Sequence, residues 1–292
     1  MSGYYDFGRG LNYAISKFTD SEILKYSAFV AFITLIIGLS GLFVVENPLL
    51  YMAIYLVAYA LLLFYVVPVF VRKTMEKVGI KVGKFPSLVD WFVMNIRMIL
   101  VNVFCWYDKK LLTPAIICLV LAVLVLVLAI TSIIEFELGA MISFVIIMLM
   151  IAVWAVAITI HSIRTGFGQY LFLGKEINES EALKMSHNII KGQTFQAFLP
   201  QIMISLVVAI PILIVVIASF VLIGQNDLVI NVLTFLWTIP AVAISMVFVT
   251  DMYKFFFENT KANATVIKNV EHKDSKIAKK KKHSVKSKKK KK

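Results

Sequence analysis

The stretch LLTPAIICLVLAVLVLVLAITSII occupies residues 111–134, and LGAMISFVIIMLMIAVWAVAITI follows at residues 138–160. Neither stretch contains Lys, Arg, Asp or Glu. Each is longer than the roughly 20 apolar residues that a helix needs to cross a hydrocarbon core about 30 Å thick. Because only residues 135–137 separate them, the two stretches predict an antiparallel hairpin of membrane-spanning helices.

Four further apolar runs have the same character, at residues 26–45, 49–71, 197–223 and 228–250. Short turns, at residues 46–48 and 224–227, join these runs in pairs. The chain is 60% hydrophobic and 16% charged, whereas roughly a quarter of a soluble domain is charged. We therefore expect an all-α integral membrane protein with six spans in three hairpins. A soluble enzyme, a disordered chain and a disulfide scaffold are excluded.

The positive charges predict the orientation of the six spans. The three hairpin turns contain no Lys or Arg and carry four acidic residues. The 30 Lys and Arg residues all lie in the remaining segments, which are residues 1–25, 72–110, 162–197 and 251–292. Loops rich in Lys and Arg stay in the cytoplasm. We therefore expect a multi-pass protein of the cell (cytoplasmic) membrane with both termini in the cytoplasm.

The segment 88–107, LVDWFVMNIRMILVNVFCWY, could be mistaken for a seventh span. At 100° per residue, however, its polar residues fall on one face and an uninterrupted apolar face lies opposite. This pattern predicts an amphipathic helix that lies in the membrane interface on the cytoplasmic side. The polar face also contains Trp91 and Met94, so we expect that face to pack on protein.

Similar helices are predicted before the other two hairpins. In the N-terminal amphipathic segment, residues 1–25, apolar residues recur at helical spacing up to Phe18, and Thr19 with Glu22 forms a capping box that starts the first span. Asn178 starts an amphipathic helix over residues 179–191. The expected plan is therefore an interfacial helix followed by a hairpin, three times, in a membrane domain over residues 26–250.

No catalytic, cofactor-binding or metal-binding site is expected. His161, His187, His272 and His283 lack the spacing of metal ligands. His161 is expected to rest at the membrane interface, and Ser186 beside His187 lacks the context of a nucleophile. The two cysteines, Cys105 and Cys118, are interpreted as small buried apolar residues.

Pro211 and Pro240 lie within the fifth and sixth spans. Each removes a backbone donor, so each is a candidate helix kink. Paired breaks of this kind can line a substrate path, but prolines also occur in spanning helices without such a role. Both interpretations stay open.

A Lys-rich tail ends the sequence, and residues 276–292 contain eleven lysines. Such a composition cannot bury apolar surface, so the segment 251–292 is expected to be a disordered cytoplasmic tail. The tail could signal topology, bind anionic lipid headgroups or bind ribosomal RNA. The candidate lysines are Lys279, Lys280, Lys281, Lys282, Lys288, Lys289, Lys290, Lys291 and Lys292.

The line EALKMSHNIIKGQTFQAF at residues 181–198 places an Ala-Leu-Lys-x-Ser helix before Lys-Gly and an aromatic residue. It resembles a line in the membrane domain found next to glycerophosphoryl diester phosphodiesterases and in related uncharacterised six-helix membrane proteins. The matching positions are Ala182, Leu183, Lys184, Ser186, Lys191, Gly192 and Phe195. The resemblance implies a fold and no activity, because the soluble phosphodiesterase domain, with its paired carboxylates and histidines, is not present.

These patterns favour a non-enzymatic protein that organises or recruits at the cytoplasmic membrane face. The first alternative is a transporter or export component with a path near Pro211 and Pro240. The second is a membrane-biogenesis factor whose tail contacts the ribosome. The expected partners are the lipid bilayer and, through the tail, anionic headgroups or ribosomal RNA.

Overall fold

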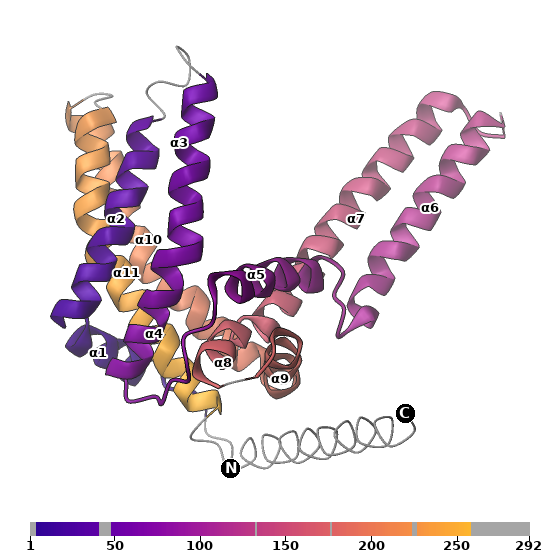
Figure 1. The fold of residues 1–292 in the computed structure, drawn as a ribbon. Coiled ribbons are helices and arrows are strands. Elements are labelled where there is room, and N and C mark those ends of the chain that lie inside the picture. Colours follow the sequence, from indigo (N-terminus) through magenta and orange to yellow (C-terminus); the bar gives the residue numbers. More distant parts are fainter. Residues whose placement is uncertain (1–3, 41–47, 132, 176, 224–226, 258–292) are drawn as a thin grey trace, which may run out of the picture. The chain divides into compact units, whose positions relative to one another are not determined.

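The computed structural model describes residues 4–40, 48–131, 133–175, 177–223 and 227–257. Throughout this part of the chain every regular element is helical (Figure 1). Six of the helices are long and apolar enough to cross a membrane, which makes the chain a multi-pass membrane protein. These spans are Ser21–Ser40, Pro48–Lys77, Lys109–Ile130, Phe136–Gly174, Thr194–Ala218 and Val229–Phe257.

Two of the predicted turns and the tail fall partly or wholly outside the described residues. The turn at 46–48 is described only at its last residue, and the turn at 224–227 only at Asp227. The predicted disordered tail, residues 251–292, begins too early, because residues 251–257 belong to helix α11 (Asp227–Phe257). The tail lysines from Lys279 to Lys292 lie outside the described residues. The predictions about these segments therefore stay predictions.

The chain divides into two compact units. Unit 1 comprises Met1–Val82 and Leu199–Lys292, and unit 2 comprises Gly83–Phe198. Unit 2 is thus one continuous stretch, whereas unit 1 combines the two ends of the sequence.

Unit 1 brings the first and last spans together. Helix α2 (Ser21–Ser40) packs extensively on α11 (Asp227–Phe257) and also contacts α3 (Pro48–Leu61) and α4 (Val67–Lys77). A Cβ atom on Gly38 would lie 3.0 Å from Oδ1 of Asn231, so the glycine permits this close approach of α2 and α11.

The N-terminal helix α1 (Phe7–Lys17) also packs on α11. Just before it, the Tyr5 hydroxyl donates a 2.9 Å hydrogen bond to Asp251 Oδ2, and Arg9 lies 3.4 Å from the same oxygen. Burial, followed by the negative charge of Asp251, raises the pKa of Tyr5. The predicted amphipathic helix therefore covers one end of the last span.

A π-helical turn, η2 (Leu62–Val66), lies between α3 and α4. The N–H of Val67 bonds the carbonyl of Leu62, five residues earlier, directly before Pro68. Because proline has no N–H and its ring crowds the preceding turn, the wider helical turn accommodates Pro68 without ending the helix.

The start of α2 lies near the end of α4, and specific residues cap both of these helix ends. Oδ1 of Asp20 accepts the N–H groups of Glu22 and Ile23 at 3.0 and 3.5 Å, so Asp20 caps α2 in place of the predicted Thr19. Helix α4 ends at Lys77, and two residues later Gly79 has a φ of +83°, which is favourable only for glycine. Lys77 lies 3.2 Å from Asp20 Oδ2, and this ion pair links the two ends.

In unit 2, α6 (Thr113–Ile130) and α7 (Phe136–Thr165) pack along each other (Figure 1). The Ser143 hydroxyl donates to the Ala122 carbonyl at 3.2 Å between them. A short 3-10 helix, η3 (Lys109–Leu112), precedes α6.

Helices α8 (Gly168–Gly174) and α9 (Glu179–Lys191) pack on each other, and α9 also packs on α7 and on α5 (Leu88–Val103). Gly168 allows the contact between α8 and α9, because an added Cβ would lie 2.7 Å from Leu183 Cδ2 and 3.2 Å from its Cα. The side chain of Asn178 accepts the Glu181 N–H at 2.9 Å, which caps α9 as expected.

The two faces of α5 have different surroundings. Trp91 and Met94 are fully buried, in agreement with the expectation that their face packs on protein. On the same side, Asn95 accepts a 2.9 Å hydrogen bond from Gln169, and Arg97 forms a 3.2 Å ion pair with Glu179. The exposed face consists of large apolar residues: Leu88, Val89, Phe92, Val93, Ile96, Ile99 and Leu100.

Helix α9 differs from α5 in what covers its apolar side. An interfacial helix would turn its apolar side to lipid, but the apolar side of α9 is buried within unit 2. Its buried apolar residues are Ala182, Leu183, Met185, Ile189 and Ile190. The amphipathic pattern of residues 179–191 therefore reflects packing on protein.

Candidate functional site

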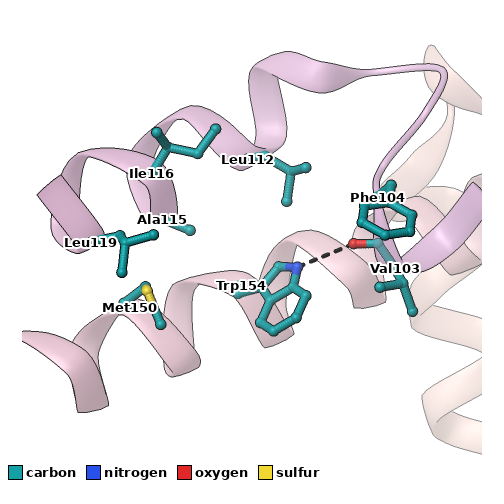
Figure 2. Close-up of a pocket in the computed structure, with 8 residues that line it drawn as sticks. All are labelled: Val103, Phe104, Leu112, Ala115, Ile116, Leu119, Met150 and Trp154. Carbon is teal, nitrogen blue, oxygen red and sulfur yellow. Dashed lines mark hydrogen bonds between the residues drawn. The ribbon is translucent and has the colours of Figure 1, made fainter.

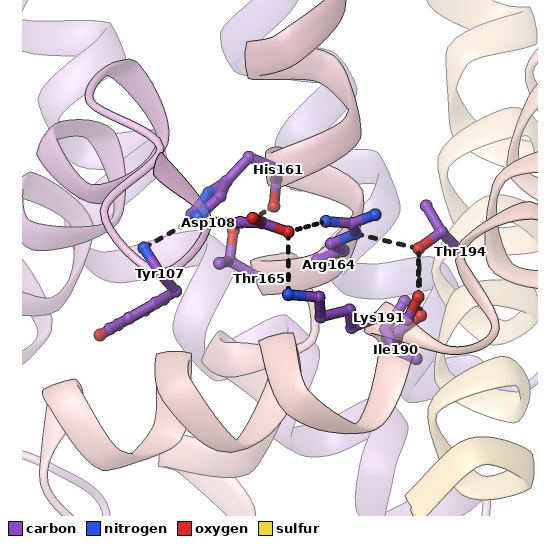
Figure 3. A network of polar contacts seen from close by, with 8 residues as sticks. All are labelled: Tyr107, Asp108, His161, Arg164, Thr165, Ile190, Lys191 and Thr194. Carbon is purple, nitrogen blue, oxygen red and sulfur yellow. Dashed lines mark hydrogen bonds and ion pairs between the residues drawn. The ribbon is translucent and has the colours of Figure 1, made fainter. Parts of the chain in front are cut away.

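A cluster of polar side chains joins three segments of unit 2 (Figure 3). It lies where the end of α5, the end of α7 and the helix α9 meet. Its members are Asn102, Tyr107, Asp108, His161, Arg164, Thr165, Ser186, His187, Lys191 and Thr194.

His161 is held by hydrogen bonds at both ring nitrogens. Its Nδ1 lies 3.0 Å from Oδ1 of Asn102, and its Nε2 accepts the Tyr107 N–H at 3.4 Å. Since the amide oxygen only accepts, this network assigns the ring proton to Nδ1. The Thr165 hydroxyl donates to the same Asn102 oxygen at 2.6 Å. His161 is thus buried in protein at the end of α7. Its expected depth at the membrane interface stays a prediction.

His187 is buried beside it, with 1% of its surface exposed. Its ring centroid lies 5.1 Å from that of His161 and 5.7 Å from that of Tyr107. Among the described residues, neither of its ring nitrogens has a hydrogen-bond partner. Burial, with the nearby charges of Arg164 and Lys191, lowers the pKa of His187 to about 4, against the opposing effect of Asp108.

An ion-pair network forms the rim of the cluster. Oδ2 of Asp108 lies 2.7 Å from Nη1 of Arg164 and 3.0 Å from Nζ of Lys191. Burial opposes ionisation of Asp108, but the two cations outweigh it and hold its pKa below the ordinary value. The Nε of Arg164 donates to the Thr194 hydroxyl at 3.0 Å. One carboxylate therefore balances two cations, and the rim keeps one excess positive charge.

The cluster does not pair a nucleophile with a general base. The Ser186 hydroxyl donates to the Arg164 carbonyl at 2.7 Å, while the ring of His187 packs against His161 and Tyr107. In the part of the chain that the structure describes, no three His, Cys, Asp or Glu side chains gather into a possible metal site. The arrangement fixes the end of α7 to α9 and leaves a cationic rim.

Two apolar grooves run along α7. The first has a volume of about 240 Å³ and lies against α6, where Nε1 of Trp154 donates to the Val103 carbonyl at 3.1 Å (Figure 2). The second has a volume of about 590 Å³ and lies between α7 and the start of α10 (Thr194–Ile223). Its lining residues are Ala155, Val156, Thr159, Ile160, Ile163, Arg164, Thr194, Phe195 and Phe198.

The candidate kinks are separate from this cluster. Pro211 lies inside α10, and Pro240 lies inside α11. Close to Pro211, the Trp237 indole N–H donates to the Val208 carbonyl at 2.9 Å. No described contact brings the two prolines to a polar site.

The amino-acid sequence does not reveal the cluster, because its members come from distant segments. A partial signal exists: His161, Arg164 and Thr165 are spaced three and four residues apart, so they share one side of α7. His187 and Lys191 are likewise four residues apart on α9. Asn102 and Asp108 carry no such signal.

Comparison with protein-family models, with curated proteins and with solved structures finds no match to this chain.

Proposed function

We propose that this protein is a non-enzymatic platform that organises or recruits other components at the cytoplasmic face of the cell membrane. Its six spans form three hairpins, both termini lie in the cytoplasm, and α5 lies in the interface between lipid and water. The interfacial position of α5 would hold the base of unit 2, made of α8, α9 and the end of α7, against the inner surface.

The observation that carries the proposal is the division of α5 into two faces. One face, with Trp91 and Met94, is buried on protein. On the other face Val89 and Ile99 are 69% and 58% exposed. A continuous exposed apolar face on an amphipathic helix is typical of a membrane-surface contact. Lipid is the environment that would cover it at the end of a spanning hairpin.

The charges of unit 2 support the proposed orientation of α6 and α7 in the membrane. Glu137 lies in the first turn of α7, and Arg164 lies in its last turn. Lys109 and Lys110 stand directly before α6. The cationic ends of both helices thus lie opposite their acidic connection, and the excess of Lys and Arg favours the cytoplasm for these ends.

The recruiting surface would be the cytoplasmic side of unit 2 together with the Lys-rich tail. Each lysine near an anionic leaflet contributes about 1 kcal/mol. The packing of Ser186 and His187 as parts of a folded polar core supports a scaffold rather than a catalytic site.

A fluorescence experiment tests the position of α5. Single cysteines at Ile99 and, as a control, at exposed Lys184 are placed in a variant lacking Cys105 and Cys118, labelled with a polarity-sensitive dye and reconstituted into vesicles. We expect a blue-shifted emission at position 99 that lipid-soluble quenchers reduce, and a water-like emission at position 184. Water-like emission at both positions would contradict the proposal.

A further inference from the structure

We infer that unit 2 contains a binding site for an anionic phospholipid, with an acyl chain in the groove between α7 and the start of α10 and the phosphate at Arg164. The inference rests on the proposed membrane position of unit 2. It does not require α5 to enter the interface, so the two ideas can fail separately.

The groove has the size and lining of a ligand site. Its volume of about 590 Å³ lies within the range of roughly 300–1,000 Å³ that is usual for small-molecule sites. Its walls are mainly apolar side chains, including Val156, Ile160 and Phe198. Because these residues belong to spanning helices, a lipid chain is the apolar occupant that the surroundings supply.

The groove has a charged group at one of its ends only. Among its described lining residues, Arg164 is the single charged one, and the hydroxyl of Thr194 lies beside it. Arg164 lies in the last turn of α7, the level at which a spanning helix meets lipid headgroups. An apolar groove closed by a guanidinium can hold one acyl chain and the phosphate of an anionic phospholipid.

The electrostatics of the rim favour a phosphate there. Asp108 compensates one of the charges on Arg164 and Lys191, so one positive charge is left. The described contacts of Arg164 use its Nε and Nη1 atoms. Its Nη2 amino group can therefore donate to a phosphate oxygen, and the Lys191 side chain, half-exposed at 51%, can reach the same anion.

The proposal is tested with the full chain in phosphatidylcholine vesicles. A small fraction of spin-labelled phosphatidylglycerol, or of phosphatidylcholine with the same labelled chain, is added, and the immobilised fraction of each is measured by electron paramagnetic resonance. We expect the anionic lipid to be immobilised in excess over the zwitterionic one.

Two groove variants and one matched control locate that excess. Val156→Trp fills the groove without touching the ion pairs, and Arg164→Gln removes the guanidinium. Val145→Trp changes an equally exposed position on α7 outside the groove (61% exposed, against 59% for Val156). All three variants carry the same Lys-rich tail, so any attraction by the tail cancels in the comparison.

We expect Arg164→Gln to reduce the preference for phosphatidylglycerol roughly threefold, the effect of one partly exposed ion pair. Val156→Trp should also reduce this preference, because the filled groove no longer holds the acyl chain. Val145→Trp should keep it. An equal preference in Val156→Trp and Val145→Trp would overturn the proposal, and so would displacement of the label by inorganic phosphate with no effect of Val156→Trp. The emission at position 99 should not change in Val156→Trp, which separates this site from α5.

Discussion

The indole N–H of Trp237 donates a 2.9 Å hydrogen bond to the carbonyl of Val208, three residues before Pro211. Pro211 has no N–H, so the carbonyl of Val207, four residues before it, lacks its usual helical donor, and the proline ring crowds the turn that also contains Val208. In a membrane such carbonyls must find another partner. Trp237, on α11, supplies an additional donor to this turn at the Val208 carbonyl, which favours a structural role for this proline over a substrate path.

This relationship predicts that Trp237 and Pro211 are energetically coupled. Trp237→Phe removes the donor and should lower the free energy of unfolding by about 1 kcal/mol. In the Pro211→Ala background the N–H of residue 211 can bond the Val207 carbonyl and the turn around Val208 is no longer crowded, so the same change should cost less. A double-mutant cycle of thermal unfolding in detergent measures the difference; additive effects would contradict the coupling. A transport role would instead require that Pro211→Ala with Pro240→Ala abolish a transport phenotype.

The pKa of His187 predicts a loss of stability in acid. The folded pKa of about 4 lies below the ordinary value of 6.5, so the unfolded chain binds a proton more readily than the folded one. Stability should therefore be full above pH 6.5, fall as the pH drops from 6.5 to about 4, and level off below. The loss should be on the order of 1–3 kcal/mol.

Thermal unfolding of the wild-type protein and of His187→Phe between pH 8 and pH 4 tests this behaviour. The variant should show a shallower pH dependence than the wild type. The charged groups around His187, namely Arg164, Lys191 and Asp108, are unchanged in the variant. Identical slopes in the two proteins would show that His187 does not titrate in this range.

Gly168 and Gly192 form a matched pair for testing the packing of unit 2. A Cβ atom at Gly168 would lie 3.2 Å from the Leu183 Cα, whereas a Cβ at Gly192 meets nothing within 4 Å. Gly168→Ala should therefore cost about 1–3 kcal/mol, and Gly192→Ala should be close to neutral. Limited proteolysis and thermal unfolding of both variants measure the difference. An equal effect would mean that α8 and α9 are less closely packed than described.

The orientation is tested with single cysteines in a variant that lacks Cys105 and Cys118. Cysteines at Asn47, Phe136 and Asn226 should react with an impermeant thiol reagent added outside the cell. One at Ser87 should react only after the membrane is opened. Labelling of Ser87 from outside would end the six-span arrangement with cytoplasmic termini.

The Lys-rich tail should be dispensable for folding. Deletion of residues 276–292 leaves the upstream Lys and Arg that set the orientation, so insertion should persist. A peptide of these residues should bind anionic vesicles at low salt and dissociate near 0.5 M salt, roughly where screening shortens the Debye length to a few ångströms. Co-sedimentation with ribosomes that the deletion abolishes would favour the biogenesis alternative instead.

The helices could be predicted from the sequence because their signals are local. Helix α9 has the predicted bounds and the predicted cap, Asn178, and α5 begins at the predicted Leu88 but ends at Val103, before the predicted Tyr107. The six apolar runs are evident from length and composition alone. Asp20 replaces Thr19 as the cap of α2 because its carboxylate can accept two N–H groups, a detail of backbone geometry that the capping pattern does not encode.

The polar cluster could not be predicted, because its hydrogen bonds join residues far apart in sequence. Asn102 and His161 are 59 residues apart, and Arg164 and Asp108 are 56 residues apart. Hydropathy and helical periodicity report how a residue relates to its own helix and carry no information on which distant side chain it meets. For the same reason the pattern of α9 did not reveal that protein, rather than lipid, covers its apolar side.

The pairing of α2 with α11 has a consequence for how the protein is made. Helix α2 ends at Ser40 and α11 begins at Asp227, so the ribosome completes all of unit 2 before the partner of the first span exists. The continuous unit 2 can assemble while synthesis proceeds, whereas the first span, α2, must wait without the partner helix on which it packs. A nascent chain halted before residue 227 should therefore contain a folded unit 2 and a helix α2 that lacks its partner α11. Quality-control proteases of the membrane could recognise that state.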